Sequence, residues 1–327
     1  MPLTLEEYAE WLENRDDLFW PKPPAVQPPK VKPLLRRLRH VRLVTFGTYG
    51  TLIAIRGGEL LLVEPNRFIM ETALEKTIHE FKMWPSMTRK PGKPSEYMAQ
   101  QYEQLLDEAK LRPAVGERYP EVRVEQIWET IIKRLMKKEY TFDTSFYGSL
   151  ERFAECVAYF FHASLQGYGP QPGALATLQR LRRHGLRLGL IGDGQVFTRV
   201  QLLRALRQEG TVESLDELFD PRFVAISAEL GARRPSETLF RHVLKAAAEE
   251  GIGPENVLHV GCSVELDIVP AKRLRMRTAL YAGDKAAVQA SKDQLADKAK
   301  RPDVLLSELR QLLLCLTASE QSQSKRS

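Results

Sequence analysis

The sequence predicts an α/β fold: a Rossmann-like parallel sheet with helices on both faces, plus an inserted helical cap domain. From residue 172 onward, short apolar segments alternate with amphipathic ones, which is typical of parallel strands joined by helices. An earlier stretch, residues 41–52, begins as an apolar strand and ends in a glycine-containing turn, where open sheets place their chemistry. About a hundred residues with helical patterning separate the two parts. A helical cap inserted after the first strand explains this order.

The composition is that of a soluble globular protein, with 43% hydrophobic and 28% charged residues in a chain of 327. The chain has no run of about 18 uncharged apolar residues, and residues 1–17 lack the basic start and apolar core expected of a secretory signal. Its three cysteines, Cys156, Cys262 and Cys315, lie far apart, as in a protein with reduced thiols. We therefore expect a cytoplasmic protein with no membrane partner, disulfide framework or zinc cluster.

The net charge of +6 arises from 48 basic and 42 acidic residues that are interspersed along the chain. No nucleic-acid-binding motif accompanies this charge, so we expect no nucleic-acid partner. The densest basic run, residues 30–40, follows a proline-rich stretch and is interpreted as a solvated lead-in helix.

Residues 1–40 are predicted to form an N-terminal helix and a proline-rich strap. Apolar residues within 4–14 fall on one helical face, and Thr4 can cap the helix. The prolines of residues 19–30 favour an extended, polyproline-like conformation. The aromatic pair that opens this stretch either packs back onto the body or forms a docking motif for a partner.

Residues 65–165 form the predicted helical cap, in which apolar residues recur three and four positions apart. A basic, proline-containing loop at 84–94 separates the first two of its helices. The predicted cap helices cover residues 68–83, 96–110, 124–138 and 150–165.

Residues 41–64 and 166–317 form the predicted α/β core, and residues 318–327 a disordered tail. After the first strand, further strands are predicted at 187–191, 223–227, 257–260, 278–281 and 303–306. Helices are predicted at 173–184, 196–208, 236–250, 264–274, 285–299 and 307–316.

Four segments of this core carry recognisable motifs at strand ends or helix starts. They read FGTYGTL at 46–52, LGLIGDG at 188–194, GARRPS at 231–236 and VGCSVELD at 260–267. In order and spacing they resemble the four motifs of the haloacid dehalogenase-like (HAD) hydrolase superfamily, in its dehalogenase-like branch with a cap after the first strand. The resemblance covers residues 41–316 and implies a HAD-like core.

The resemblance also implies a mechanism in which an aspartate attacks phosphorus or carbon and forms a covalent ester. Gly47 stands at the position of that nucleophile and has no side chain to form the ester. Tyr49 stands where most phosphatases of the family have an aspartate as general acid. An unperturbed phenol, with a pKa near ~10, is a poor acid at neutral pH.

The remaining motif positions also depart from the family pattern. In the second motif, Gly192 stands where the family usually has a Ser or Thr, so the hydroxyl of that residue is missing. The carboxylate of Asp193 beside it would repel a phosphate. Arg234 replaces a lysine, and Cys262 replaces an aspartate that ligates Mg²⁺, a cation that prefers oxygen ligands. Asp267 is retained and can form an ion pair with Arg234 without a metal.

The sequence therefore predicts a non-catalytic binding or regulatory protein without cofactor, because the Mg²⁺ ligands at 47 and 262 are lost. An unknown protein partner or a small anionic ligand is expected, and Thr48, Thr51 and Arg234 could bind the anion with the turn amides. The alternative is an active phosphatase-like or dehalogenase-like hydrolase with rearranged catalytic residues, for example with Cys262 as nucleophile.

Overall fold

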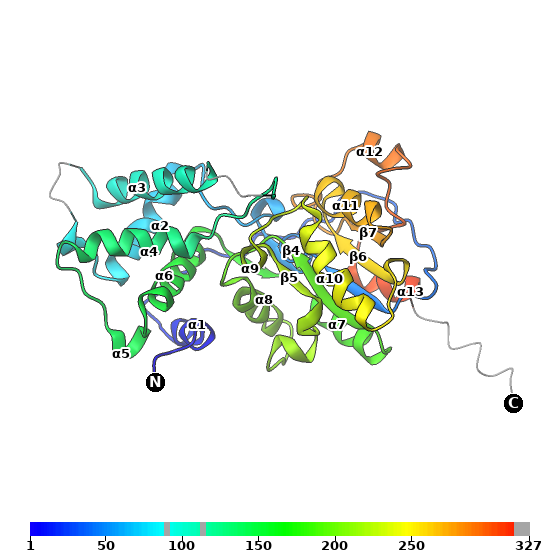
Figure 1. The fold of residues 1–327 in the computed structure, drawn as a ribbon, viewed down its shortest axis with the longest axis horizontal. Coiled ribbons are helices and arrows are strands. Elements are labelled where there is room, and N and C mark those ends of the chain that lie inside the picture. The colour runs from blue at the N-terminus through cyan, green and yellow to red at the C-terminus, as the bar shows by residue number, and fades with distance from the viewer. Residues whose placement is uncertain (88–91, 112–115, 317–327) are drawn as a thin grey trace, which may run out of the picture.

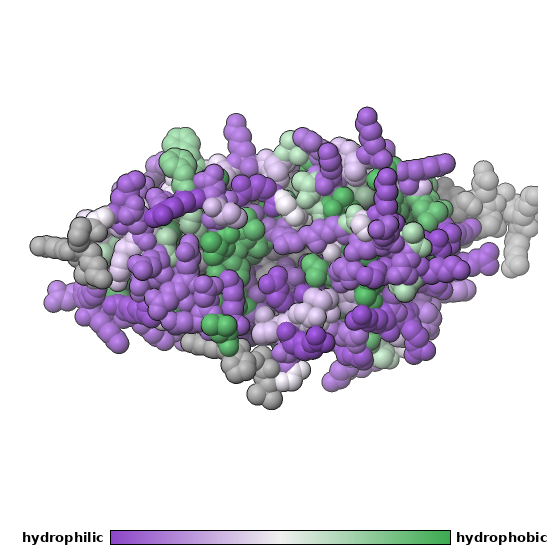
Figure 2. Space-filling model, turned by 90° about the horizontal axis from the view of Figure 1, so that it is seen from above, coloured by the Kyte–Doolittle hydropathy of each residue, from purple (hydrophilic) through white to green (hydrophobic). Residues whose placement is uncertain are grey.

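The computed structural model describes residues 1–87, 92–111 and 116–316. The predicted tail and part of the basic loop at 84–94 lie outside these ranges. Two lobes share the elongated molecule, one helical and one built on the sheet (Figure 1). Figure 2 shows a mostly hydrophilic face with hydrophobic side chains gathered over the inner part of the helical lobe. Among the described residues, no helix has the length and apolar composition needed to cross a membrane.

A six-stranded sheet organises the second lobe, with every neighbouring pair of strands parallel in the order β5-β4-β1-β6-β7-β8. Nearly all strand residues are buried, as expected for a sheet covered on both faces. The α/β fold class is confirmed. The strands are β1 (Leu43–Phe46), β4 (Arg187–Gly192), β5 (Val224–Ile226), β6 (Val257–Gly261), β7 (Arg277–Tyr281) and β8 (Val304–Leu306).

Helices cover both faces of this sheet. The apolar faces of α7 and α8 pack on side chains such as Val44 and Leu188, whereas α10 packs on Leu43 and Ile191, which point to the other face. The helices are α7 (Ala174–Arg183), α8 (Thr198–Arg207), α9 (Ser227–Leu230), α10 (Glu237–Glu249), α11 (Val269–Arg273), α12 (Lys292–Ala296) and α13 (Leu312–Leu316).

The helix predicted for 285–299 is wrong in length, because only the five residues of α12 are helical. None of these residues is buried. A helix of this size that buries no apolar face gains too little from packing to extend further.

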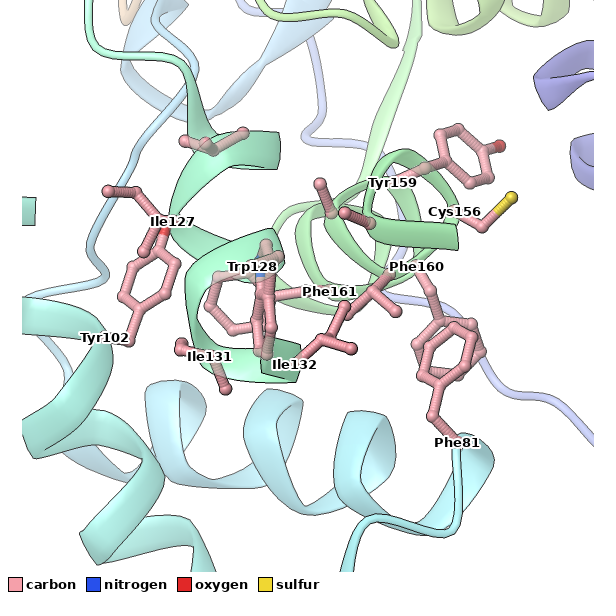
Figure 3. Close-up of a cluster of buried hydrophobic side chains, with 14 of the residues drawn as sticks. Phe81, Tyr102, Ile127, Trp128, Ile131, Ile132, Cys156, Tyr159, Phe160 and Phe161 are labelled. Carbon is pink, nitrogen blue, oxygen red and sulfur yellow. The ribbon is translucent and has the colours of Figure 1, made fainter. Parts of the chain in front are cut away.

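The helical lobe is built around α6, which packs against α2 and α4. Figure 3 shows its centre, where Trp128 of α4 and Tyr102 of α3 surround Phe161 of α6. The ring centroids of Trp128 and Tyr102 lie 5.3 and 5.1 Å from that of Phe161. The helices are α2 (Arg67–Glu80), α3 (Pro94–Lys110), α4 (Val124–Met136), α5 (Thr144–Tyr147) and α6 (Leu150–Leu165).

An antiparallel pair of short strands, β2 (Ile53–Ile55) and β3 (Tyr168–Pro170), joins the lobes where the chain leaves the sheet and returns to it. The sequence analysis misses this pair because three residues are too few to show an alternating pattern.

The N-terminal helix α1 (Leu5–Glu13) begins with the predicted cap, in which Thr4 and Glu7 form reciprocal hydrogen bonds. This helix packs against both α6 of the helical lobe and α8 of the sheet lobe. Arg204 of α8 strengthens the contact with a 2.7 Å hydrogen bond from Nε to the carboxylate of Glu13. The N-terminal segment thus contacts both lobes.

The helix predicted for the basic run 30–40 is also wrong. This segment is extended, and Leu34 exchanges two 3.0 Å backbone hydrogen bonds with Leu305 of β8. Pro33 disfavours a helical conformation of the preceding residue, and the free edge of β8 offers backbone partners instead.

Candidate functional site

The four motifs meet at the carboxyl ends of β1, β4 and β6, as parallel strands require. Gly47 follows β1 and donates a 2.8 Å backbone hydrogen bond to Val260 of β6. Asp193 follows β4, and Cys262 follows β6. Arg234 reaches the same place from the loop between α9 and α10, so all four segments contribute to one site.

Arg234 occupies the centre of the site and is only 8% exposed. Its Nη1 forms an ion pair with Asp267, and its Nε lies 3.4 Å from Oδ2 of Asp193. The backbone amide of Arg234 also donates to Asp193, at 2.8 Å. Burial alone disfavours the charged guanidinium, but the two carboxylates outweigh it and raise the pKa of Arg234. This cation is therefore already neutralised by the protein.

Asp267 is fully buried, and its oxygens are satisfied by several groups. One accepts a 2.9 Å hydrogen bond from the backbone amide of Ser263, and the other lies 3.2 Å from Nε2 of His259. The opposite ring nitrogen of His259 lies 3.0 Å from the hydroxyl of Thr45. Burial opposes ionisation of Asp267, but Arg234 and the hydrogen bond with His259 outweigh it and lower the pKa of the carboxyl.

Among the described residues, no carboxylate oxygen is one of the three atoms nearest to a Cβ built on Gly47. A Cβ atom added there would lie 2.9 Å from the hydroxyl of Thr51 and 3.8 Å from Nη1 of Arg234. These are the nearest polar side-chain groups, and neither is an acid. The Thr51 hydroxyl itself is buried and has no hydrogen bond to a protein nitrogen or oxygen among the described residues.

Thr48 fills the space where the family's second-motif hydroxyl would lie. A Cβ atom at Gly192 would be 2.7 Å from the Thr48 hydroxyl and 3.0 Å from its backbone nitrogen. That hydroxyl donates a 3.0 Å hydrogen bond to the backbone carbonyl of Asp193. Of the three predicted anion donors, Thr48 and Arg234 thus already have protein partners, which does not favour an anion site.

Neither Tyr49 nor Cys262 is prepared for acid or nucleophilic catalysis. The Tyr49 hydroxyl is buried between Gln201 and Thr198, at 2.5 and 3.0 Å, and burial raises its pKa far above the neutral range. Burial and the nearby charge of Asp267 raise the pKa of the Cys262 thiol to about 12. The thiol is therefore protonated at neutral pH.

The residues present do not fit a magnesium ion. Gly47 offers no ligand, the Cys262 thiol is protonated, and Asp267 is bound to Arg234. Within the described part of the chain, no group of three or more His, Cys, Asp or Glu side chains is arranged to hold a metal.

A cavity of about 50 Å³ lies at the mouth of the site, with Tyr49, Asp193, Gln195 and Arg234 along its wall. Ligand pockets are usually about 300–1,000 Å³. The site is therefore much smaller than a substrate pocket.

A segment of the helical lobe, residues 117–124, closes this mouth, and we call it the cap clamp. Pro120 forms an antiparallel β-bridge with Ala232 on the loop that carries Arg234. The backbone amide of Arg233 donates a 2.8 Å hydrogen bond to the carbonyl of Tyr119. A bridge of one residue pair has no sequence pattern, so the sequence analysis misses it.

Side chains extend the contact of the cap clamp to the loop after β4. Gln195 accepts a 3.0 Å hydrogen bond from the amide of Val124 and donates one of 2.9 Å to the carbonyl of Val122. Glu121 accepts a 2.6 Å hydrogen bond from the hydroxyl of Ser227, and burial raises the pKa of this carboxyl. The two lobes are thus hydrogen-bonded to each other directly above the site.

Comparison with known proteins links this chain to phosphatases and dehalogenases, although no family model matches it. The chain is 33% identical over 143 residues to glyceraldehyde 3-phosphate phosphatase of Pyrococcus furiosus. This match covers 43% of this chain and 52% of that protein. It is 34% identical over 109 residues to the enzyme of the same name from Methanocaldococcus jannaschii, covering 33% and 42%. The chain thus spans about half the length of the curated relatives it matches.

Among solved structures, the chain is similar to a 2-haloacid dehalogenase from Pseudomonas syringae pv. tomato, with a TM-score of 0.52. The match covers 84% of this chain and 97% of that one at 21% identity, which demonstrates a common fold. The fold expected from the four motifs is therefore confirmed, and this chain has the fold of a haloacid dehalogenase.

Proposed function

We propose that the chain is a non-catalytic member of the HAD-like group, with a binding or regulatory role. One observation carries the proposal: Arg234 is paired with Asp193 and Asp267 beside a glycine at the position of the nucleophile. The cation that would meet a substrate is occupied, and the atom that would attack it is missing.

Substrate binding would require the internal ion pairs to be broken. A phosphate at this place would meet one guanidinium and two carboxylates, and breaking a buried ion pair costs several kcal/mol. The phosphatase names of the relatives therefore do not carry over easily to this chain, in which the protein's own carboxylates compete with the substrate.

The proposed role requires no magnesium ion. It relies on the outer surface of the protein to bind a partner. A pocket of about 50 Å³ under a hydrogen-bonded clamp admits no substrate-sized ligand. A protein partner is favoured over a small anionic ligand for the same reason. The surface of the helical lobe and the N-terminal strap, with the exposed side chain of Phe19, is available to such a partner.

An active hydrolase with rearranged residues is the competing function. It would need a nucleophile that is ionised at neutral pH, and the raised pKa of the Cys262 thiol, about 12, speaks against the nearest candidate.

Turnover measurements distinguish the two functions. The purified protein is incubated with a panel of phosphate monoesters and Mg²⁺ and, separately, with 2-haloacids. We expect no release of phosphate or halide above the rate without protein. Turnover that is abolished by Cys262→Ala or Arg234→Ala, but not by the exposed neighbour variant Arg233→Ala, would establish the active hydrolase instead.

A further inference from the structure

Eight lysine and arginine side chains lie at the edge of the sheet lobe remote from the helical lobe. These side chains are all exposed, and none of them forms an ion pair with a described carboxylate. They are Lys30, Lys32, Arg36, Arg37, Arg39, Arg180, Arg182 and Arg183, and we call this surface the cationic face.

The local sequence leaves these charges uncompensated. No aspartate or glutamate occurs between Leu18 and Gly58. Elsewhere in the described chain many exposed arginines have a carboxylate close by, as Arg199 has in Glu229 at 2.7 Å. Like charges held together repel one another, so an anionic partner would relieve a cost that the free protein bears.

The cations stand on a fixed backbone. Leu34 is hydrogen-bonded to β8, and the amide of Leu38 donates a 2.9 Å hydrogen bond to the carbonyl of Cys315 in α13. The basic end of α7 belongs to the same surface because α7 packs against α13. Figure 1 shows the N-terminal segment passing beside α13, with α7 next to it.

Aliphatic side chains are exposed among these cations. Val31, Leu34 and Leu35 are 38%, 36% and 38% exposed, and Leu314 of α13 is 69% exposed. A nucleic acid would use the cations but not these aliphatic groups, and residues 21–45 contain no Phe, Tyr or Trp on which a base could stack. A lipid surface uses both kinds of side chain, with cations at the headgroups and aliphatics in the interface.

We propose that the cationic face binds peripherally to a membrane surface rich in anionic phospholipids. The arginines of this face precede β1 and β4 and so lie toward the ends of those strands opposite to the candidate site, and the binding goes beyond the proposed function and does not depend on it. The inference reverses the expectation from sequence, in which the same run is a solvated helix and no membrane partner exists. Surface adsorption needs no membrane-spanning helix.

Co-sedimentation of the full-length protein with vesicles tests the proposal. We expect binding to phosphatidylcholine vesicles that contain phosphatidylglycerol, none to phosphatidylcholine alone, and loss of binding at high salt, which shortens the screening length. The triple variant Arg36→Glu, Arg37→Glu, Arg39→Glu is expected to lower the partition coefficient at least 100-fold. Each cation near an anionic surface contributes about 1 kcal/mol to binding, and about 1.4 kcal/mol corresponds to a tenfold change.

A matched triple variant shows whether vesicle binding depends on the cationic face or only on the net charge of the protein. Lys82→Glu, Lys110→Glu, Lys137→Glu changes the net charge equally on the helical lobe and should leave binding within a few-fold of the wild type. Leu34→Ser with Leu35→Ser should weaken binding while preserving its salt dependence.

Three results would overturn the proposal. The first is that the protein does not sediment with the anionic vesicles at low salt, and the second is that the two triple variants lose vesicle binding equally. The third is that a single- or double-stranded RNA is retained in gel-shift assays at a salt concentration at which vesicles no longer bind. The last result would identify a nucleic acid as the partner.

Discussion

Charged side chains are arranged in opposite ways in the candidate site around Arg234 and on the cationic face. In the site, the charges of Arg234, Asp193 and Asp267 are largely removed from water and paired with one another, although Nε of Arg234 has no hydrogen-bond partner among the described residues. On the cationic face, eight exposed Lys and Arg side chains have no carboxylate partner among the described residues. Burial makes an unpaired charge very costly, whereas water tolerates it on the surface. A charge paired internally serves stability, and a charge left unpaired is available to a partner.

Replacing one arginine in each region tests this comparison, and the larger effect is expected for Arg234. Arg234→Met leaves Asp267 buried with only the His259 ring and an amide as partners, so we expect the free energy of unfolding to fall by about 3–5 kcal/mol. Urea unfolding followed by circular dichroism measures this loss. A loss below about 1 kcal/mol would contradict a structural role for the ion pair.

The pH dependence of stability at acid pH tests the contribution of the buried Asp267. The pKa of Asp267 is lowered by folding, so its contribution is complete above the unfolded pKa of about 3.9 and is lost as the pH falls toward the folded value. We expect the unfolding free energy to decrease from about pH 5 downward. Asp267→Asn, which cannot titrate, should show a shallower decrease over this range; an unchanged slope would assign the acid sensitivity to other carboxyls.

The cap clamp gives the next largest effect. Gln195→Ala removes both of its hydrogen bonds to the cap clamp and leaves the buried amide of Val124 and the part-buried carbonyl of Val122 without this partner. We expect a loss of about 1–3 kcal/mol and faster hydrogen exchange at the amide of Val124. Gln208→Ala, on the exposed end of α8, is the control and should change neither quantity. Equal exchange at Val124 in both variants would mean that the side chain does not hold the clamp.

Removing one cation from the cationic face is expected to have a small effect in the opposite direction. Arg37→Met should leave stability within about 0.5 kcal/mol of the wild type, with a slight gain at low salt because one repulsive charge is gone. Urea unfolding at low and high salt measures the difference. A clear loss of stability would reveal an internal partner for Arg37 and remove it from the set of available charges.

Restoring the family's acidic residues is expected to have no effect on activity. Gly47→Asp with Cys262→Asp places two carboxylates beside Arg234, where the Cβ at 47 is already 2.9 Å from the Thr51 hydroxyl. We expect neither phosphatase turnover nor a heat of Mg²⁺ binding in calorimetry, because the guanidinium occupies the place of the cation. Mg²⁺ binding by this double variant would mean that only side chains, and not the shape of the site, were lost.

The sequence predicts the parts of the fold that depend on repeated patterns. The helices of the cap and the parallel strands follow from apolar periodicity, and the four motifs locate the site because each lies at a strand end or a helix start. The β2–β3 pair and the cap clamp escape prediction because a contact of one to three residues leaves no periodic signal. Residues 30–40 escape because a free strand edge, which no local sequence reveals, decides their conformation.

The chemistry of the site is predicted by residue type, but its geometry is not. The ion pair between Arg234 and Asp267 follows from the motifs. The second carboxylate, Asp193, turns out to hold Arg234 instead of merely repelling a phosphate. That the Thr48 side chain fills the space above Gly192 depends on the close approach of two loops, which only the structure reveals.

The N-terminal helix, packed on α6 and α8 at once, has a consequence for how the molecule melts. Two lobes joined only by hinges can unfold in separate steps, but a helix that packs against both lobes couples their transitions. Heating should therefore produce one calorimetric peak for the whole chain. Deleting residues 1–14 should split it into two, with the helical lobe, which loses Tyr8 and Leu12 from its core, melting first.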